Sequence, residues 1–360
     1  MTISINQYAN SGNLSSVQTS VKSLTQQEKL LSEETSSGVI SQSYAGLGDG
    51  RAQALNLNPQ ITAISTWQNS ITSAQNKLTV TQSALTEISS IASDLSVNMM
   101  ALKGDFGKEQ LSSSSQEAAS ALSTLSNLLN TSDGSGYVFA GVDSQVAPVA
   151  NESAFTSGNL MQGISSLVSN LSSAGGDSVF QDATSLATGT GSYASYSVFS
   201  SELSVTGAEA STQQSVAVIG ANMTTSVGMV ATEGDDATST STGSPIKDLI
   251  RNLMIVASLG DADTSTSGFS DLVSNLVQST SQITTDITTE QGKLGIAQNQ
   301  LSDRSTYLTT ISTQLSTKLS SITSADLATV SVQTTQISKQ LQASYSLIAS
   351  MKGMSLASYL

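Results

Sequence analysis

The sequence predicts a mainly α protein. It is expected to be an elongated, coiled-coil-like helical bundle formed by the N- and C-terminal segments, with a small mixed or β-containing inserted domain. The first observation is an apolar repeat of seven, uninterrupted by proline, at Ile287, Leu294, Leu301, Leu308, Leu315 and Ile322. The second is a pair of heptad rows in the N-terminal half. Because a seven-residue repeat keeps one narrow apolar stripe on one side of a helix, such a helix needs another helix to cover it.

The composition favours long helices with uncharged polar faces and argues against catalysis. The 360 residues include 71 Ser and 40 Thr, and only 11 % are charged. The net charge of −14 is spread thinly without clusters of Lys or Arg, so we expect no nucleic-acid interface and no basic membrane-surface helix. The sequence has no His and no Cys, which excludes His-based triads, cysteine nucleophiles and disulfides. We expect no enzymatic activity, no cofactor and no metal.

The first predicted helix covers roughly residues 11–35. Its apolar stripe, spaced three and four apart, consists of Leu14, Val17, Val21, Leu24 and Leu31. Gly38 is expected to end this helix, and 39–50 is expected to be an irregular loop.

The second helix is the clearest element of the N-terminal half. Its two heptad rows are Ile64, Ile71, Leu78, Leu85, Ala92 and Met99, and Trp67, Ala74, Thr81, Ile88, Leu95 and Leu102. A break is expected over 103–107, a third helix over 112–129, and a strand-like run over 137–140 after a glycine-containing turn.

The segment 142–243 lacks this regularity and is predicted to be the small inserted domain. A short helix is expected near 164–171, and strands are expected over 193–205 and 215–219. Helices resume at Ser244 and Pro245, residue types favoured at the N-cap and the first helical position. That helix is too polar to span a membrane, and no cleavable signal peptide is expected at the N-terminus.

A long helix is then expected from Ser270 to about Thr323, followed by a joint at 324–326 and a final helix. The apolar residues of the final helix include Leu327, Val330, Ile337, Leu341 and Ile348. The expected domains are an inner terminal helix (1–43), half of the bundle (44–141), a variable outer domain (142–243), the other half of the bundle (244–323) and a second inner terminal helix (324–360).

The two terminal helices are predicted to pair with each other and to carry self-assembly, because no neighbouring core covers their stripes. They are rich in Ser, Thr and Gln, which are mediocre helix formers, so their order depends on packing. The predicted assembly interface is Leu14, Val17, Val21, Leu24, Leu31, Leu327, Val330, Ile337, Leu341 and Ile348.

Two motifs suggest chemistry that their surroundings do not support. Asp261, Asp263, Ser265 and Ser267 superficially resemble a calcium loop, but the sixth and twelfth positions, which require Gly and Glu, hold Thr266 and Leu272. Ser244 and Lys247 match S-x-x-K, but the partner motif K-T-G is absent and helix capping explains the serine.

Short motifs in a fixed order resemble the flagellin superfamily. They lie at 35–40 (T-S-S-G-V-I), 128–141 (ending G-Y-V-F-A-G), 294–301, 322–328 and 354–360. The second and last are most similar to hook–filament junction proteins (hook-associated protein 3), with filament flagellin as the near alternative. Val39 and the stretch 47–50 depart from the family pattern.

The resemblance implies a structural subunit of the bacterial flagellum, exported without cleavage. It implies terminal helices in an inner tubular layer, a helical bundle outside them and a variable outer domain. The implied partners are further copies in a homo-oligomer or helical polymer, other flagellar axial proteins such as hook-associated proteins and flagellin, and an export chaperone. The alternative class is an extracellular adhesin or binding module with a helical stalk.

Overall fold

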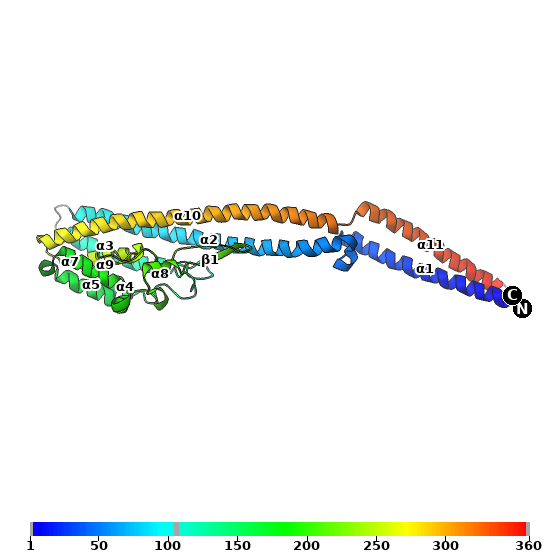
Figure 1. The fold of residues 1–360 in the computed structure, drawn as a ribbon, viewed down its shortest axis with the longest axis horizontal. Coiled ribbons are helices and arrows are strands. Elements are labelled where there is room, and N and C mark those ends of the chain that lie inside the picture. Colours follow the sequence, from blue (N-terminus) through cyan, green and yellow to red (C-terminus); the bar gives the residue numbers. More distant parts are fainter. Residues whose placement is uncertain (1–2, 104–107, 358–360) are drawn as a thin grey trace. The chain divides into compact units, whose positions relative to one another are not determined.

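The computed structural model describes residues 3–103 and 108–357. Its contacts divide the chain into two compact units: unit 1 combines Met1–Ser65 with Leu308–Leu360, and unit 2 is Thr66–Tyr307. Two long helices, α2 (Arg51–Leu102) and α10 (Ser267–Thr323), each contribute to both units. The predicted fold class is confirmed, since long helices dominate the described residues and a two-stranded antiparallel sheet lies in the inserted segment (Figure 1).

Unit 1 is organised around two terminal helices that run antiparallel and side by side (Figure 1). They are α1 (Ile3–Ser37) and α11 (Leu327–Ala357). α1 begins earlier than expected and ends as predicted at Gly38, whose φ of +71° lies in the left-handed region that favours glycine.

The prediction of an irregular loop over 39–50 is wrong in its second half, which forms the 3₁₀ helix η1 (Tyr44–Gly50). Leu47 is its buried apolar anchor, and a single anchor gives no periodic signal in a sequence.

Backbone hydrogen bonds link the turn that follows α1 to the joint that precedes α11. Ile40 N donates to Thr323 O at 2.8 Å, and Ala325 N donates to Gly38 O at 2.9 Å. The joint predicted at 324–326 is therefore a short extended link paired with the turn that follows α1.

The long helices of unit 2 bury the heptad rows that the sequence shows. α2 and α10 run antiparallel here, with Gln291 of α10 donating to Thr86 of α2 at 3.5 Å (Figure 1). From Ile71 to Met99, every member of the first row of α2 is fully buried. In the second row Trp67 is only half-buried. The row in α10 is buried from Ile287 to Leu308, as a bundle core requires, whereas Leu315 and Ile322 are only half-buried.

The helix α9 (Pro245–Ser258) is covered on all sides within unit 2. It packs against α3 (Lys108–Leu129), α5 (Asn159–Ser169) and α7 (Gly176–Ala187). A helix enclosed in this way forms the centre of a local core.

The inserted segment contains more helix than the sequence predicted. Besides α5 and α7 its elements are α4 (Ala154–Ser157), α6 (Leu171–Ala174), η2 (Gly191–Tyr196), η3 (Ser201–Leu203), α8 (Gly207–Ser211), β1 (Val216–Gly220) and β2 (Met223–Ser226). The strand expected at 215–219 is confirmed by β1, which pairs with β2. The short helix expected near 164–171 is α5 together with the start of α6.

Two predicted strands are wrong. The segment 193–205 forms η2 and η3, because short apolar runs broken by Ser close into turns. The segment 137–140 forms a buried turn whose Tyr137 and Val138 amides bond to Ser144 O and Thr131 O. A short apolar run does not by itself distinguish a strand from another buried segment.

Candidate assembly interface

The seam between α1 and α11 uses the apolar residues predicted for assembly. Leu31, Val330 and Leu341 are buried there, at 8 %, 5 % and 6 % exposure. Five others are half-buried: Val17, Val21, Leu24, Ile337 and Ile348. Leu327 is 52 % exposed, and the side chain of Leu14 lies outside the described residues.

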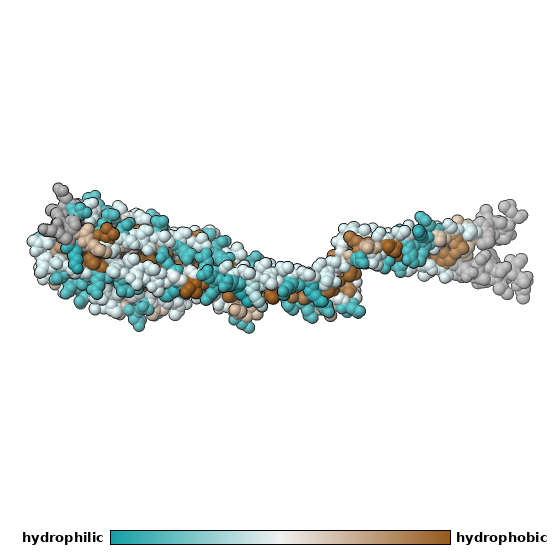
Figure 2. Space-filling model, turned by 90° about the horizontal axis from the view of Figure 1, so that it is seen from above, coloured by the Kyte–Doolittle hydropathy of each residue, from teal (hydrophilic) through white to brown (hydrophobic). Residues whose placement is uncertain are grey.

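The predicted pairing of the two terminal helices is confirmed, and the expectation that nothing nearby covers their stripes needs correction, because each helix covers part of the other. Two helices alone shield only the sides that face each other. Apolar residues accordingly remain visible in patches along the terminal helices (Figure 2). Burying a fully exposed Val or Leu side chain stabilises a structure by about 1.5–3 kcal/mol, so the uncovered part of unit 1 favours association.

Asp326 fixes the beginning of α11. Its carboxylate accepts hydrogen bonds from the backbone amides of Ala328 and Thr329 and from Thr329 Oγ1, which lies 2.7 Å away. The hydroxyl of Thr329, followed by the two amides, lowers the pKa of Asp326. This N-cap explains why the joint of the sequence contains Asp before Leu327.

Charge is distributed unequally between the two units. Unit 1 contains six basic and five acidic side chains, whereas unit 2 contains seven basic and 22 acidic ones. Like charges repel over about 8 Å at physiological ionic strength. Copies of the chain can thus approach closely at unit 1 with little repulsion, whereas unit 2 opposes close approach.

A buried polar cluster on α9 was missed by the sequence analysis. Arg251 is fully buried and forms an ion pair with Asp248 at 2.9 Å. Its guanidinium also donates to Thr184 Oγ1 and Ser279 Oγ and lies 4.3 Å from the centre of the Phe180 ring. The cluster therefore links α7, α9 and α10, and a buried charge with this many partners specifies one arrangement of the three helices.

Ser244 and Lys247 do not form a catalytic pair. Lys247 Nζ donates to the carbonyl oxygens of Thr188 and Val205, at 2.9 and 2.8 Å, and burial lowers its pKa to about 8. Ser244 stands at the predicted N-cap of α9, but its hydroxyl is buried without a hydrogen-bond partner among the described residues. The side-chain cap that the sequence predicted for Ser244 is therefore not formed.

The described residues, 3–103 and 108–357, contain neither a candidate metal site nor a candidate membrane span. Within these ranges, no three or more acidic side chains gather closely enough to hold a metal ion. Asp263 caps a turn instead, by accepting from Ser265 N and Oγ. No helix in the described part of the chain has the length and apolarity needed to cross a bilayer.

Residues 277–360 match the family model of the bacterial flagellin C-terminal helical region. This stretch contains most of α10 and all of α11, and it supports the resemblance to the flagellin superfamily. No curated protein matches the sequence. A solved structure provisionally described as a flagellar hook-associated protein from Vibrio parahaemolyticus is 12 % identical, with 73 % of this chain and 96 % of that chain covered. Its TM-score is 0.43, and at that value the likeness carries no argument about this chain.

Proposed function

We propose that this chain is a structural subunit of the bacterial flagellum that self-assembles through α1 and α11. The observation that carries the proposal is the apolar seam between α1 and α11, which is only partly covered. It lies in unit 1, whose net charge is close to zero. The match of residues 277–360 to the flagellin C-terminal helical region supports it from the sequence side. The subunit acts by helix packing and performs no reaction.

Within the flagellum, we assign the chain to the junction between hook and filament, with the filament itself as the second candidate. The segment Gly136–Gly141 and the ending Met354–Leu360 favour the junction, because they resemble junction proteins more than filament flagellins. Gly141 is the structurally constrained member: its φ is +66°, and a side chain there would collide with the carbonyl oxygen of Gln213.

The partners follow from this assignment. Further copies of the chain pack against unit 1, other flagellar axial proteins adjoin the assembly at its two ends, and an export chaperone protects the apolar seam before secretion. The strongly acidic unit 2 suits a position at larger radius, where neighbouring copies are farther apart.

Immunogold electron microscopy of the host cells tests the location. A single labelled band at the base of each filament is expected for a junction subunit, and labelling along the whole filament would assign the chain to the filament. Label on isolated rods over the cell surface, with unlabelled flagella, would refute the flagellar proposal and favour the adhesin.

A further inference from the structure

A continuous run of buried residues, 227–233, lies in irregular backbone directly after β2. This buried strap belongs to no helix and no strand, so it lacks the regular ladder of hydrogen bonds that usually satisfies a buried backbone. Val227 N donates to Ser215 O at 2.7 Å, and Ala231 N donates to Phe139 O at 2.9 Å. Because the strap is fastened to its neighbours at separate points, the loss of one of them favours its release.

Glu233 closes a turn at the end of the strap. Its backbone N–H donates to Val230 O at 3.1 Å, and its carboxylate oxygen Oε2 accepts from Val230 N at 2.9 Å. The same oxygen accepts from Gln214 Nε2 at 2.9 Å, which ties the turn to the segment before β1. Glu233 is only 4 % exposed, and its carboxylate forms no ion pair with any described residue. Burial thus removes water from this carboxylate without supplying a cation, which disfavours its charged form.

The charged groups around the strap do not reverse this preference. They are Glu290 and Lys293 of α10, Lys77 of α2, Asp133 and Asp235. Burial raises the pKa of Glu233 from 4.5 to about 7, and the negative charge of Glu290 acts in the same direction. The hydrogen bonds from Val230 and Gln214 and the charge of Lys293 act against these causes without cancelling them. Lys293 is itself paired with Glu290 at 2.7 Å and is 64 % exposed, so its charge is largely screened from Glu233.

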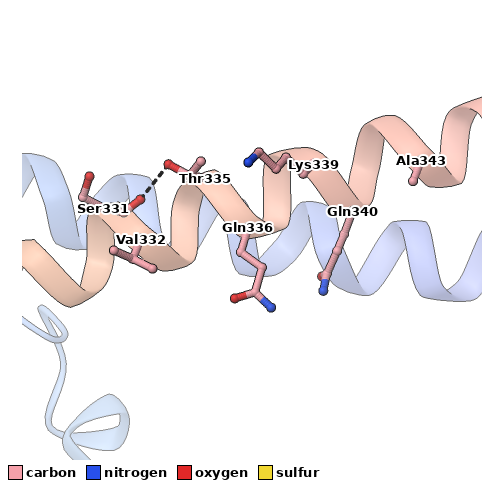
Figure 3. A pocket seen from close by; sticks show the side chains of 7 residues that line it. All are labelled: Ser331, Val332, Thr335, Gln336, Lys339, Gln340 and Ala343. Atoms are coloured by element: carbon pink, nitrogen blue, oxygen red, sulfur yellow. Dashed lines mark hydrogen bonds between the residues drawn. The ribbon is translucent and has the colours of Figure 1, made fainter.

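Glu233 differs from the charged side chains that lie on the surface. Lys339, for example, is exposed in a shallow groove of α11 beside Gln336 and Gln340 (Figure 3). Water stabilises such a charge without any movement of the backbone. Water reaches the carboxylate of Glu233 only when the strap moves, so ionisation and movement of the strap are coupled.

We infer that the strap 227–233 is a pH-sensitive latch, which is seated while Glu233 is protonated and opens more often once Glu233 is ionised. The neutral carboxyl suits the seat, because its carbonyl oxygen still accepts from Val230 and Gln214 and no charge is buried. The ionised carboxylate gains hydration when the strap lifts away, and such local opening has a free energy of its own. The latch is a property of unit 2 and stands whether or not the chain belongs to a flagellum.

Methionine oxidation measures this opening in the unmodified chain, because Met229 lies in the strap and is only 2 % exposed. Brief treatment with hydrogen peroxide converts accessible methionine to its sulfoxide, and peptide mass spectrometry reports each site. Met254 of α9 is fully buried and reports opening of unit 2 as a whole, whereas Met100 is 60 % exposed and reports the reactivity of the reagent.

The pKa of Glu233, 4.5 when solvated and about 7 when seated, sets the expected profile. The oxidation rate of Met229 relative to Met100 should rise roughly 40-fold from pH 5 to pH 7, and by less than about twofold more up to pH 8. Met254 should stay slow throughout.

Two variants identify the group that controls the latch. Glu233→Gln keeps the shape and an acceptor oxygen but cannot ionise, so Met229 is expected to react at one slow rate from pH 5 to pH 8. Glu202→Gln, the same change at an exposed carboxylate of the inserted segment, should keep the rise of the unmodified chain. A flat profile of Met229 in the unmodified chain, or a rise that survives in Glu233→Gln, would overturn the latch. A rise of Met254 equal to that of Met229 would overturn its local character and assign the opening to unit 2 as a whole.

Discussion

Replacing Leu341 by alanine measures how strongly α11 is held to α1. Leu341 is 6 % exposed, so nearly all of its side chain is removed from water at the seam. Buried Leu→Ala changes lower the free energy of unfolding by about 2–5 kcal/mol. Because water can enter a seam of only two helices, we expect a loss of about 2 kcal/mol. Leu347→Ala is the matched control, because the same change is made on the same helix at a 49 % exposed site.

The effect is expected to be local, since segments of a protein open with their own free energies. A loss of about 2 kcal/mol raises the population of the open state roughly 30-fold. Hydrogen exchange of the free chain should therefore become roughly 30-fold faster over 327–351, while α9 is unchanged. Equal exchange in Leu341→Ala and Leu347→Ala would refute the packing of α11 on α1, and faster exchange in α9 would refute the local nature of the opening.

Three further predictions concern assembly, the buried cluster and pH. Leu24→Asp should abolish incorporation into flagella and leave unit 2 folded, as measured by pelleting and circular dichroism; normal incorporation would remove Leu24 from the interface. Arg251→Ala should destabilise unit 2 by about 3–5 kcal/mol in thermal unfolding, because a buried carboxylate loses its cation, and a loss below about 1 kcal/mol would contradict that role. Burial raises the pKa of Glu233 from 4.5 to about 7, so its contribution to stability is present below pH 4.5 and is lost as the pH rises through about 7. Burial lowers the pKa of Lys247 from 10.5 to about 8, so the free energy of unfolding rises again between pH 8 and 10.5. The minimum in stability therefore lies between about pH 7 and 8. Unfolding of Glu233→Gln should lack the decline up to pH 7, and an unchanged profile would show that another group causes it.

The heptad rows could be predicted from the sequence because their packing is periodic and local. The row from Ile71 to Met99 is buried along one side of α2, as a repeat of seven requires. The helix ends were also readable at Gly38 and at Asp326, where the residue type satisfies a specific backbone need.

The inserted segment was predicted less well, because its structure depends on contacts that are distant in sequence. Arg251 is stabilised by residues 67 positions before it and 28 positions after it, and no local pattern announces such partners. The helix α7 was missed because Gly, Ser and Thr dilute its apolar side, although Val179, Phe180 and Ala183 are buried. β1 also differs from a fully buried strand, because the side chains of Val216 and Val218 are exposed.

Part of the assembly interface could also be predicted from the sequence. The stripes of the terminal helices are correct as apolar rows, but part of their burial already occurs between α1 and α11 of one chain.

The most direct test of the account is a cryo-electron microscopy map of the assembly isolated from the host. The account predicts that α1 and α11 of many copies form the innermost tubular layer, with unit 2 outside. A map in which unit 1 projects into solvent, with unit 2 making the contacts between copies, would contradict it.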